Sequence, residues 1–414
     1  MMRKAMSVIL AAAMAASLAA CGGTSTTSTT AESTTAADSS VAEGTSAAES
    51  TDTAADGDKT GTFKIGAIGP ITGSAAVYGT AVMDGAELAV NEINAAGGIN
   101  GYQVEYQFQD DENDVEKSIN AYNTLKDWGM QMLVGTTTSN PCISVAAESA
   151  VDNLFQITPS GSAVECVENP NVFRVCFSDP DQGAASAQYI GEHQLASKIA
   201  IIYDSSSVYS SGIMEKFVSE AANQNLEIVA NEAFTAETNT DFTTQLQKAK
   251  DGGAELIFLP IYYTEASLIL NQANQMGLDV DFFGCDGMDG ILQVENFDTS
   301  LAEGLMLLTP FVADATDELT QSFVSSYEAA YGSTPIQFAA DAYDAVYAIK
   351  AAAEDAGLTP DMSVSDLCEG LKTSMTKITI NGLTGDNMTW NEAGEPVKAP
   401  KAMKIENGAY TAME

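Results

Sequence analysis

Short apolar runs alternate along the chain with longer stretches in which apolar residues recur every three to four positions. The short runs are typical of buried strands and the longer stretches of amphipathic helices. We predict strands at residues 63–68, 104–108, 132–134, 155–157, 199–203, 228–234, 256–259 and 305–308. Helices are predicted at residues 81–95, 115–128, 144–152, 183–194, 212–223, 242–250 and 265–276. This alternation predicts an α/β protein with parallel sheets covered by helices on both faces.

The number of predicted strands favours two lobes over one. A single sheet of about eleven strands would be unusually wide, so two α/β lobes of roughly 120–150 residues each fit the pattern better. A crossover between them is predicted near Ser178-Asp179-Pro180-Asp181, where a strand-like run ends in turn residues. A closing hairpin is predicted around Asn407-Gly408.

The first residues have the pattern of an export signal. Arg3 and Lys4 precede an apolar run, at 5–20, that is short for a membrane span and ends in Leu18-Ala19-Ala20-Cys21. Small residues before a cysteine resemble a bacterial lipobox. We predict a signal peptide at 1–20 and a lipidated Cys21, carrying for example palmitate; a plain secretory signal is the alternative.

The following segment, 22–61, contains no aromatic residue and is rich in Ser, Thr and Ala with scattered acids. Such a segment cannot bury enough apolar surface to offset the entropy lost on ordering. With Cys21 it is predicted to be a disordered tether, at 21–61.

Charge and rare residues exclude several classes of function. The 414 residues include 57 Asp and Glu against 17 Lys and Arg, for a net charge of −40, and one histidine, His193. This excess of acid argues against binding nucleic acid through a basic face. A single histidine rules out a histidine-rich zinc site. The chain also lacks a Cys-x-x-Cys motif that could bind a metal, so we predict no metal and no cofactor. Five cysteines follow Cys21, an odd number whose pairing the sequence leaves open.

Two hydroxyl-bearing segments follow neighbouring predicted strands. Ser139-Asn140-Pro141 comes after 132–134, with Pro141 placed to begin a helix near Cys142 and Ser139 on the loop before it. Thr158-Pro159-Ser160-Gly161-Ser162 comes after the next strand. Loops at neighbouring strand ends can form a concave site for a small carboxylate, helped by free helix N–H groups. An ordinary capped helix is the alternative for the first segment.

A possible counter-group lies in Gly284-Cys285-Asp286-Gly287, where the Asp286 carboxylate could receive an ammonium group. A plain Asp-Gly turn is the alternative, and the segment lacks the spacing of a calcium loop. Hydrolysis is disfavoured, because His193 sits in a helical run and the chain has no Gly-x-Ser-x-Gly motif. We therefore predict a binding protein and no enzyme.

Further motifs occur in a definite order along 62–395. They are Ile65-Gly66-Ala67-Ile68-Gly69-Pro70-Ile71-Thr72-Gly73, Tyr78-Gly79, Gly85-Ala86-Glu87, Ala89-Val90-Asn91-Glu92-Ile93-Asn94-Ala95-Ala96-Gly97-Gly98-Ile99-Asn100-Gly101, Asp110-Asp111, Asp181-Gln182-Gly183 and Phe282-Phe283-Gly284. In these the chain resembles the extracytoplasmic substrate-binding proteins of ABC transporters for branched-chain amino acids, the Leu/Ile/Val-binding protein family. The order of many motifs makes the resemblance more specific than any one of them.

The resemblance implies a type I periplasmic-binding-protein fold, with two Rossmann-like α/β lobes of parallel sheets joined by a three-strand hinge. Lobe 1 is expected at 62–180 plus about 309–385, and lobe 2 at 181–308 plus about 386–414. It also implies that Ser139 and Ser162 hold the ligand's α-carboxylate, and that the Ser160 carbonyl and Asp286 hold its ammonium group. Tyr209 is expected to support Asp286. The walls of the side-chain pocket are expected to be Tyr78, Tyr262 and Phe338. The match at Tyr209 requires a one-residue insertion.

Two departures from the family affect the expected ligand. Asn113 and Thr138 occupy the positions of a disulfide found in some members, so that bond is absent. Thr137 and Thr138 also make the pocket wall more polar than an aliphatic ligand would favour, which leaves a small polar, aromatic or other amino acid open.

The predicted function is a membrane-anchored, extracytoplasmic receptor that captures a neutral amino acid and delivers it to ABC permease subunits. The membrane contact is made by the N-terminal lipid, and no nucleic-acid partner is expected. The alternative is a sensory module of the same fold that signals to a membrane partner.

Overall fold

The computed structural model describes residues 59–413. The predicted signal peptide, the lipidation of Cys21 and nearly all of the tether concern residues outside this range. Within residues 59–413, no helix combines the length and apolar character needed to cross a membrane.

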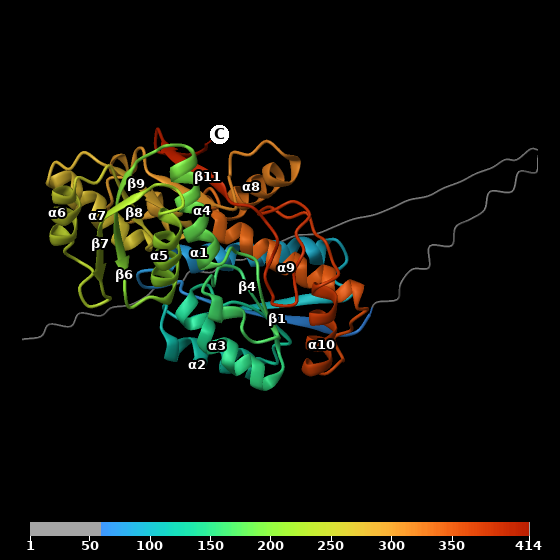
Figure 1. Ribbon diagram of the computed structural model, residues 1–414. Coiled ribbons are helices and arrows are strands. Elements are labelled where there is room, and N and C mark those ends of the chain that lie inside the picture. Colours follow the sequence, from blue (N-terminus) through green and yellow to red (C-terminus); the bar gives the residue numbers. More distant parts are fainter. Residues whose placement is uncertain (1–58, 414) are drawn as a thin grey trace, which may run out of the picture. The chain divides into compact units, whose positions relative to one another are not determined.

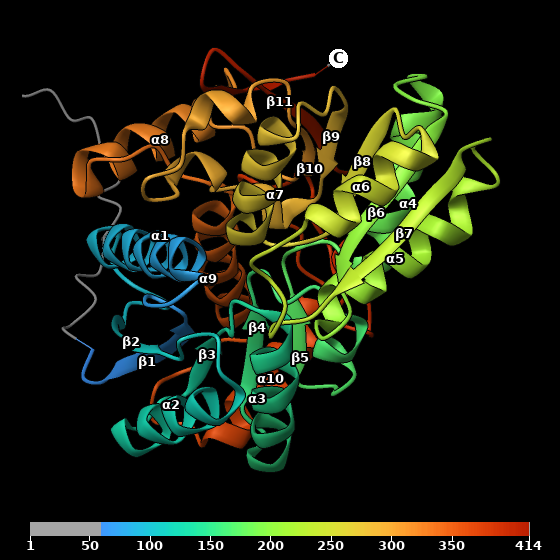
Figure 2. The ribbon, with the colours of Figure 1, turned by 90° about the vertical axis from the view of Figure 1, so that its left-hand side faces the viewer.

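The first sheet contains five parallel strands in the order β2-β1-β3-β4-β5. They are β1 (Thr62–Gly69), β2 (Gln103–Asp110), β3 (Met132–Val134), β4 (Phe155–Thr158) and β5 (Val172–Arg174). Helices cover both of its faces: α1 (Ala76–Ala95), α2 (Val115–Trp128), α3 (Ser139–Asp152), α9 (Gln337–Asp355) and α10 (Val364–Met375). Figure 2 shows α1 and α9 on one side of the strands and α2 and α3 on the other. Side chains of β1 divide accordingly, because Ile65 packs in the cluster with α1 and α9 whereas Ile68 packs with α2 and α3.

The second sheet contains seven strands in the order β12-β11-β10-β9-β8-β6-β7. They are β6 (Lys198–Asp204), β7 (Glu227–Phe234), β8 (Leu256–Leu259), β9 (Asp281–Gly284), β10 (Met306–Thr309), β11 (Lys401–Glu406) and β12 (Ala409–Ala412). The strands from β6 to β10 pair in parallel, while β11 and β12 form the predicted antiparallel hairpin. Its turn places Asn407 and Gly408 at φ 55° and 74°, a conformation that these two residue types adopt readily.

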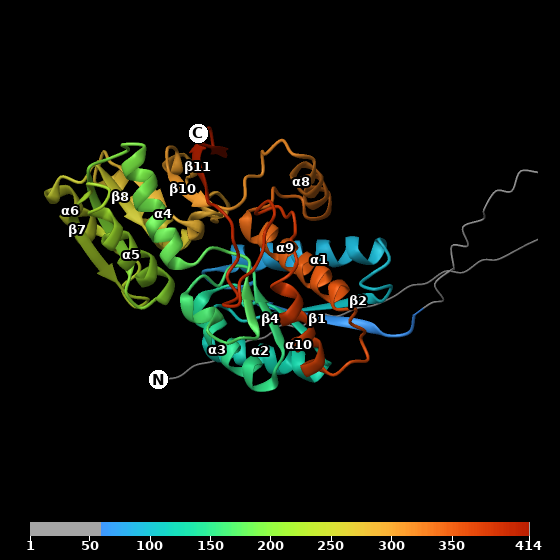
Figure 3. The same cartoon turned by 45° about the vertical axis from the view of Figure 1, so that its right-hand side comes forward.

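The helices of the second lobe also lie on both faces of their sheet. They are α4 (Asp179–Glu192), α5 (Val208–Ala221), α6 (Thr243–Gly252) and α7 (Tyr263–Gln275). Alternate residues of β6 point to opposite faces: Ile199 and Ile201 pack with α4 and α5, whereas Ala200 and Ile202 pack with α6 and α7. Figure 3 shows α4 and α5 side by side along this sheet. The continuous apolar run of β6 is therefore explained by burial on both faces.

Three crossovers join the two lobes. The chain leaves the first sheet after β5 to enter α4, returns after β10 through α8 (Glu318–Tyr331) to α9, and passes back after α10 to β11 (Figure 1). Short 3₁₀ segments complete the regular structure: η1 (Val164–Val167), η2 (Asp286–Met288), η3 (Ile291–Gln293) and η4 (Thr299–Ala302). The predicted fold class, two α/β lobes with parallel sheets and a three-strand hinge, is confirmed.

Candidate ligand-binding site

The helix that carries Ser139 begins earlier than predicted. α3 starts at Ser139 itself after an extended Thr138, and the Cys142 N–H already donates to the Thr138 carbonyl at 3.0 Å. The prediction of a loop at Ser139 and a helix start near Cys142 was wrong. The prediction took Pro141 as the first residue of the helix, but proline is tolerated anywhere in a first turn, because the N–H groups there lack helical acceptors.

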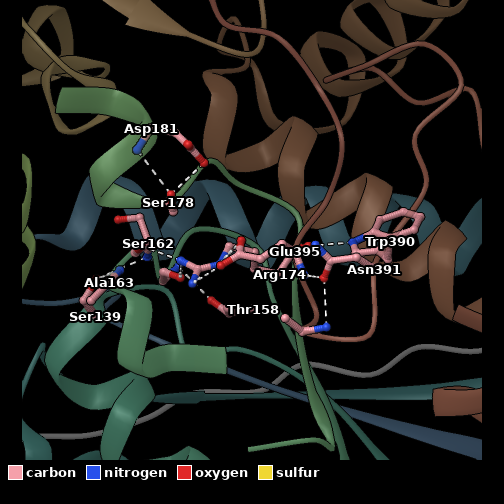
Figure 4. A network of polar contacts seen from close by, with 12 residues as sticks. Ser139, Thr158, Ser162, Ala163, Arg174, Ser178, Asp181, Trp390, Asn391 and Glu395 are labelled. Carbon is pink, nitrogen blue, oxygen red and sulfur yellow. Dashed lines mark hydrogen bonds and ion pairs between the residues drawn. The ribbon is translucent and has the colours of Figure 1, made fainter. Parts of the chain in front are cut away.

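The two predicted hydroxyl-bearing segments meet at the carboxyl edge of the first sheet. Ser139 Oγ accepts hydrogen bonds from the backbone N–H groups of Ser162 and Ala163, each at 3.2 Å (Figure 4). Both bonds are long, and the hydroxyl proton of Ser139 remains available to donate. Ser162 Oγ is buried and has no hydrogen-bond partner among the described residues. This edge therefore offers the hydroxyls of Ser139 and Ser162 as donors, while the two backbone N–H groups already donate to Ser139.

Ser160 is committed to the fold through its side chain. Its hydroxyl donates to the Thr137 carbonyl at 2.6 Å. The hydroxyl is thus occupied within the first lobe, and only the Ser160 carbonyl could serve the predicted ammonium contact.

Arg174 holds the loop of Gly161 and Ser162 in place, a role that sequence reasoning missed. Its side chain is fully buried and donates to the carbonyls of Gly161 and Ser162. On its other side the guanidinium pairs with Glu395, with Nε–Oε2 at 2.9 Å and Nη2–Oε1 at 3.0 Å (Figure 4). An arginine that ends an apolar strand was the available signal, because a buried guanidinium requires carbonyl or carboxylate partners.

Asp286 and Tyr209 come together on the second lobe. The Tyr209 hydroxyl donates to Asp286 Oδ1 at 2.7 Å and accepts from the Gly287 N–H at 3.0 Å. A Cβ at position 287 would lie 2.6 Å from that hydroxyl, so glycine is required there. Burial raises the pKa of Asp286 to about 6, while the bonds from Tyr209, Gly287 and Gln182 oppose the rise. The alternative of a plain turn does not explain a buried carboxylate held in this way.

The first turn of α4 adds two polar groups near Asp286 that carried no predicted role. The Gln182 Oε1 accepts from the Asp286 N–H at 3.2 Å, and Gln182 Nε2 is buried without a hydrogen-bond partner among the described residues. Both carboxylate oxygens of Asp179 are likewise buried and unpartnered among those residues. Burial raises the pKa of Asp179 well above its usual value, and the Ser162 hydroxyl opposes the rise without reaching hydrogen-bond geometry. The turn residues of the predicted crossover were the signal for Asp179, and the motif Asp181-Gln182-Gly183 was the signal for Gln182.

Tyr78, Tyr262 and Phe338, the predicted pocket walls, form one aromatic cluster in which Tyr78 and Phe338 are buried in the core. The ring of Tyr78 stacks on Phe338 at 4.1 Å between centroids and meets Tyr262 edge-on at 5.3 Å. Tyr209 continues the cluster, 5.0 Å from Tyr262. The Tyr78 hydroxyl also donates to the Gly287 carbonyl, so this tyrosine of α1 bonds across to the second lobe.

A cleft of about 380 Å³ opens between the lobes beside this cluster. Its wall includes Asn113 and Asn140 from the first lobe and Tyr209 and Tyr262 from the second. At this wall the Thr138 hydroxyl donates to Asn113 Oδ1 at 2.7 Å. A hydrogen bond therefore joins the two positions where some family members have a disulfide. Each of the five cysteines in residues 59–413 is a buried free thiol.

Of the eight residues predicted to contact a ligand, Tyr209 and Tyr262 line this cleft and the other six do not. Two α/β lobes with a cleft between them define a two-lobed ligand-binding protein. The chain belongs to the periplasmic binding protein family, whose family model matches residues 62–409. Its members are extracytoplasmic solute-binding proteins and are not enzymes.

The chain is similar to several named amino-acid-binding proteins. The Leu/Ile/Val-binding protein BraC3 of Rhizobium johnstonii is 28% identical over 328 residues, covering 78% of this chain and 88% of that protein. The leucine-, isoleucine-, valine-, threonine-, and alanine-binding protein of Pseudomonas aeruginosa is 28% identical over 301 residues, covering 72% and 79%. The crystal structure of the branched-chain amino acid transporter substrate binding protein LivJ from Streptococcus pneumoniae, in complex with isoleucine, matches with a TM-score of 0.77 and 30% identity. That match covers 85% of this chain and 99% of LivJ.

Proposed function

We propose that this chain captures a neutral α-amino acid of about branched-chain size between its lobes and delivers it to the permease of an ABC importer. The observation that carries the proposal is that the first lobe provides hydrogen-bond donors and the second lobe provides a carboxylate. Donors at Ser139 and Ser162 lie on the first lobe, and the carboxylate of Asp286 lies on the second. A zwitterion presents a carboxylate and an ammonium group that match these two ends.

The proposed carboxylate contacts are the hydroxyls of Ser139 and Ser162, together with the Ser162 N–H, which would exchange its long bond to Ser139 Oγ for the ligand. The proposed ammonium contacts are Asp286, held by Tyr209, and the Ser160 carbonyl. In a closed, mostly dry site each of these bonds is stronger than in water, so a ligand bound to both lobes favours closure. The lobes that would close are 62–180 with about 309–385, and 181–308 with about 386–414.

The side chain of the ligand is proposed to lie against Tyr78, Tyr262 and Phe338. Aromatic faces accept aliphatic groups well, which fits a leucine-, isoleucine- or valine-sized ligand. The names of the relatives support this class. The polar wall at Thr138 and Asn113 supports testing threonine and alanine alongside them.

We further propose that Cys21 is acylated after removal of residues 1–20 and tethers the protein to the outer face of the cell membrane. Delivery to a permease is preferred to the sensory alternative because LivJ of Streptococcus pneumoniae is a transporter substrate binding protein. Stimulation of the reconstituted transporter's ATPase by the loaded protein would distinguish transport from sensing.

The decisive experiment is calorimetric titration of the purified protein with the neutral, acidic, basic and aromatic amino acids. We expect the tightest binding for one or more of the neutral aliphatic amino acids, and none for their amides lacking the α-carboxylate. Binding only to sugars, peptides or aromatic acids would reject the proposal.

A further inference from the structure

The first turns of α1 and α7 meet across the two lobes. α1 belongs to the first lobe and α7 to the second (Figure 2). α1 begins after Ala75 and α7 begins after Tyr262, and neither of these residues accepts a capping hydrogen bond through its side chain. The N–H groups of a first helical turn have no acceptor within the helix, so acceptors for them must come from outside it.

Each of the two helices receives such an acceptor from the other lobe. The Val77 N–H, in the first turn of α1, donates to the hydroxyl oxygen of Tyr263 at 3.1 Å. The Tyr263 N–H, the first of α7, donates in a longer bond of 3.3 Å to the hydroxyl oxygen of Tyr78. Both tyrosine side chains are buried, and their rings pack edge-on with centroids 4.8 Å apart. The two helices therefore cap each other reciprocally.

Two further contacts join the same helix starts. The Thr264 hydroxyl donates to the Ser74 carbonyl at 2.7 Å. Gly290 of the second lobe lies so close to Val77 that a Cβ at position 290 would be 2.9 Å from the Val77 side chain. Of the residues in all these contacts, only Tyr78 is among those proposed to contact the amino acid. The lobes are therefore joined here mostly by groups that have no proposed role in holding the ligand.

We propose that these contacts form a clasp, with Ser74, Val77 and Tyr78 on one side and Tyr263 and Thr264 on the other, and that Tyr263 is an affinity-determining residue outside the predicted ligand contacts. Opening the lobes separates the two helix starts and exchanges each bond for one to water. Each bond therefore favours the closed arrangement by only about fivefold. A ligand that binds the closed arrangement is held more tightly, and released more slowly, when closure is favoured.

The test compares the double variant Tyr263→Phe/Thr264→Val with the unchanged protein. It removes the acceptor for Val77 and the donor to Ser74 while keeping the size of both side chains. Small-angle X-ray scattering of the refolded, ligand-free protein should give a larger radius of gyration for the variant. Saturating leucine should return that radius to the value of the unchanged protein. The dissociation rate of leucine, followed by stopped-flow fluorescence, should rise by about tenfold or more.

Tyr122→Phe is the matched control, because it removes the hydroxyl of an equally buried tyrosine whose bond, to Asp152 Oδ2 at 2.9 Å, lies within the first lobe. This control should lower stability but change neither the radius of gyration nor the dissociation rate. The inference rests on the proposed function for its ligand, but the scattering measurement uses none. A failure of every amino acid to bind would therefore refute the proposed function and leave the scattering result to decide on the clasp.

The clasp is overturned if the double variant keeps both the radius of gyration and the dissociation rate of the unchanged protein. It is equally overturned if Tyr122→Phe changes them as much as the double variant does.

Discussion

The hydroxyl of Tyr209 lies 2.7 Å from Asp286 Oδ1, although the two residues are 77 positions apart in the chain. The bond fixes the orientation of a buried carboxylate. Replacing Asp286 by Asn keeps the acceptor for Tyr209 but removes the charge that an ammonium requires. We expect amino-acid affinity to fall by about 2–5 kcal/mol, measured by calorimetric titration. Tyr209→Phe should cost only about 1 kcal/mol, because it removes one neutral donor.

The control for this pair is Asp281→Asn, an exposed carboxylate at the start of β9 on the same lobe. The Asp281→Asn variant should bind the amino acid with the same affinity as the unchanged protein. A loss of less than tenfold in Asp286→Asn would exclude Asp286 as the ammonium partner.

The raised pKa of Asp286, about 6, makes a pH dependence of binding testable. Only the ionised carboxylate pairs with an ammonium, so affinity should rise as pH rises through this value. Between about pH 5 and pH 7 the ionised fraction grows about tenfold, and the dissociation constant should fall by the same factor. Titrations across this range measure it. Asp286→Asn should remove this step, and an unchanged step in that variant would assign it to another buried acid such as Asp179.

Arg174 and Glu395 provide a test of loop support. Arg174→Met leaves Glu395 and two carbonyls without their donor. We expect the free energy of unfolding to fall by about 2–3 kcal/mol, somewhat less than for a fully buried pair because the Glu395 side chain is 28% exposed. Amino-acid affinity should fall as well, because the loop that carries Ser162 loses its support. Urea unfolding and calorimetry measure the two effects.

A surface pair serves as the comparison for Arg174. Lys248 pairs with Glu232 at 2.6 Å, but the lysine side chain is 55% exposed. Lys248→Met should therefore change stability by less than about 1 kcal/mol and leave binding intact. Equal effects of the two substitutions would contradict the supporting role of Arg174.

The hydrogen bond between Thr138 and Asn113 predicts that a disulfide can be introduced there. The two positions lie 25 residues apart, so the cross-link in Asn113→Cys/Thr138→Cys should stabilise the oxidised protein by about 3 kcal/mol over the reduced form. Urea unfolding with and without reductant measures this. The five other described cysteines are buried, so native-state thiol titration reports on the new pair. Two reactive thiols under oxidising conditions would show that the positions do not meet.

Much of the fold could be predicted from local pattern. Each predicted strand overlaps an observed one. The central strands were the clearest, because a strand buried on both faces must be continuously apolar, as β6 is over residues 199–202. The hairpin at Asn407-Gly408 was predicted correctly for an equally local reason, since the turn needs residues that tolerate positive φ. The start of α3 was placed too late, because Pro141 permits several positions in a first turn and only packing selects one.

The candidate site was predicted less completely. Polar residues after predicted strand ends indicated Ser139, Ser162 and Asp286 from the sequence alone, and the family resemblance added Tyr209. The support from Arg174 and the buried polar groups of Asp179 and Gln182 were missed, because their roles depend on neighbours that are distant in sequence.

The sequence by itself determined the class of fold, the alternation of strands and helices, and the residue types offered for a zwitterion. Periodicity and turn chemistry act over a few residues and are written directly into the chain. Only the tertiary structure decided that Asp286 is buried against Tyr209 and that Arg174 holds the Ser162 loop. Burial and long-range hydrogen bonding depend on how the two sheets and three crossovers fold together, and no local pattern specifies that.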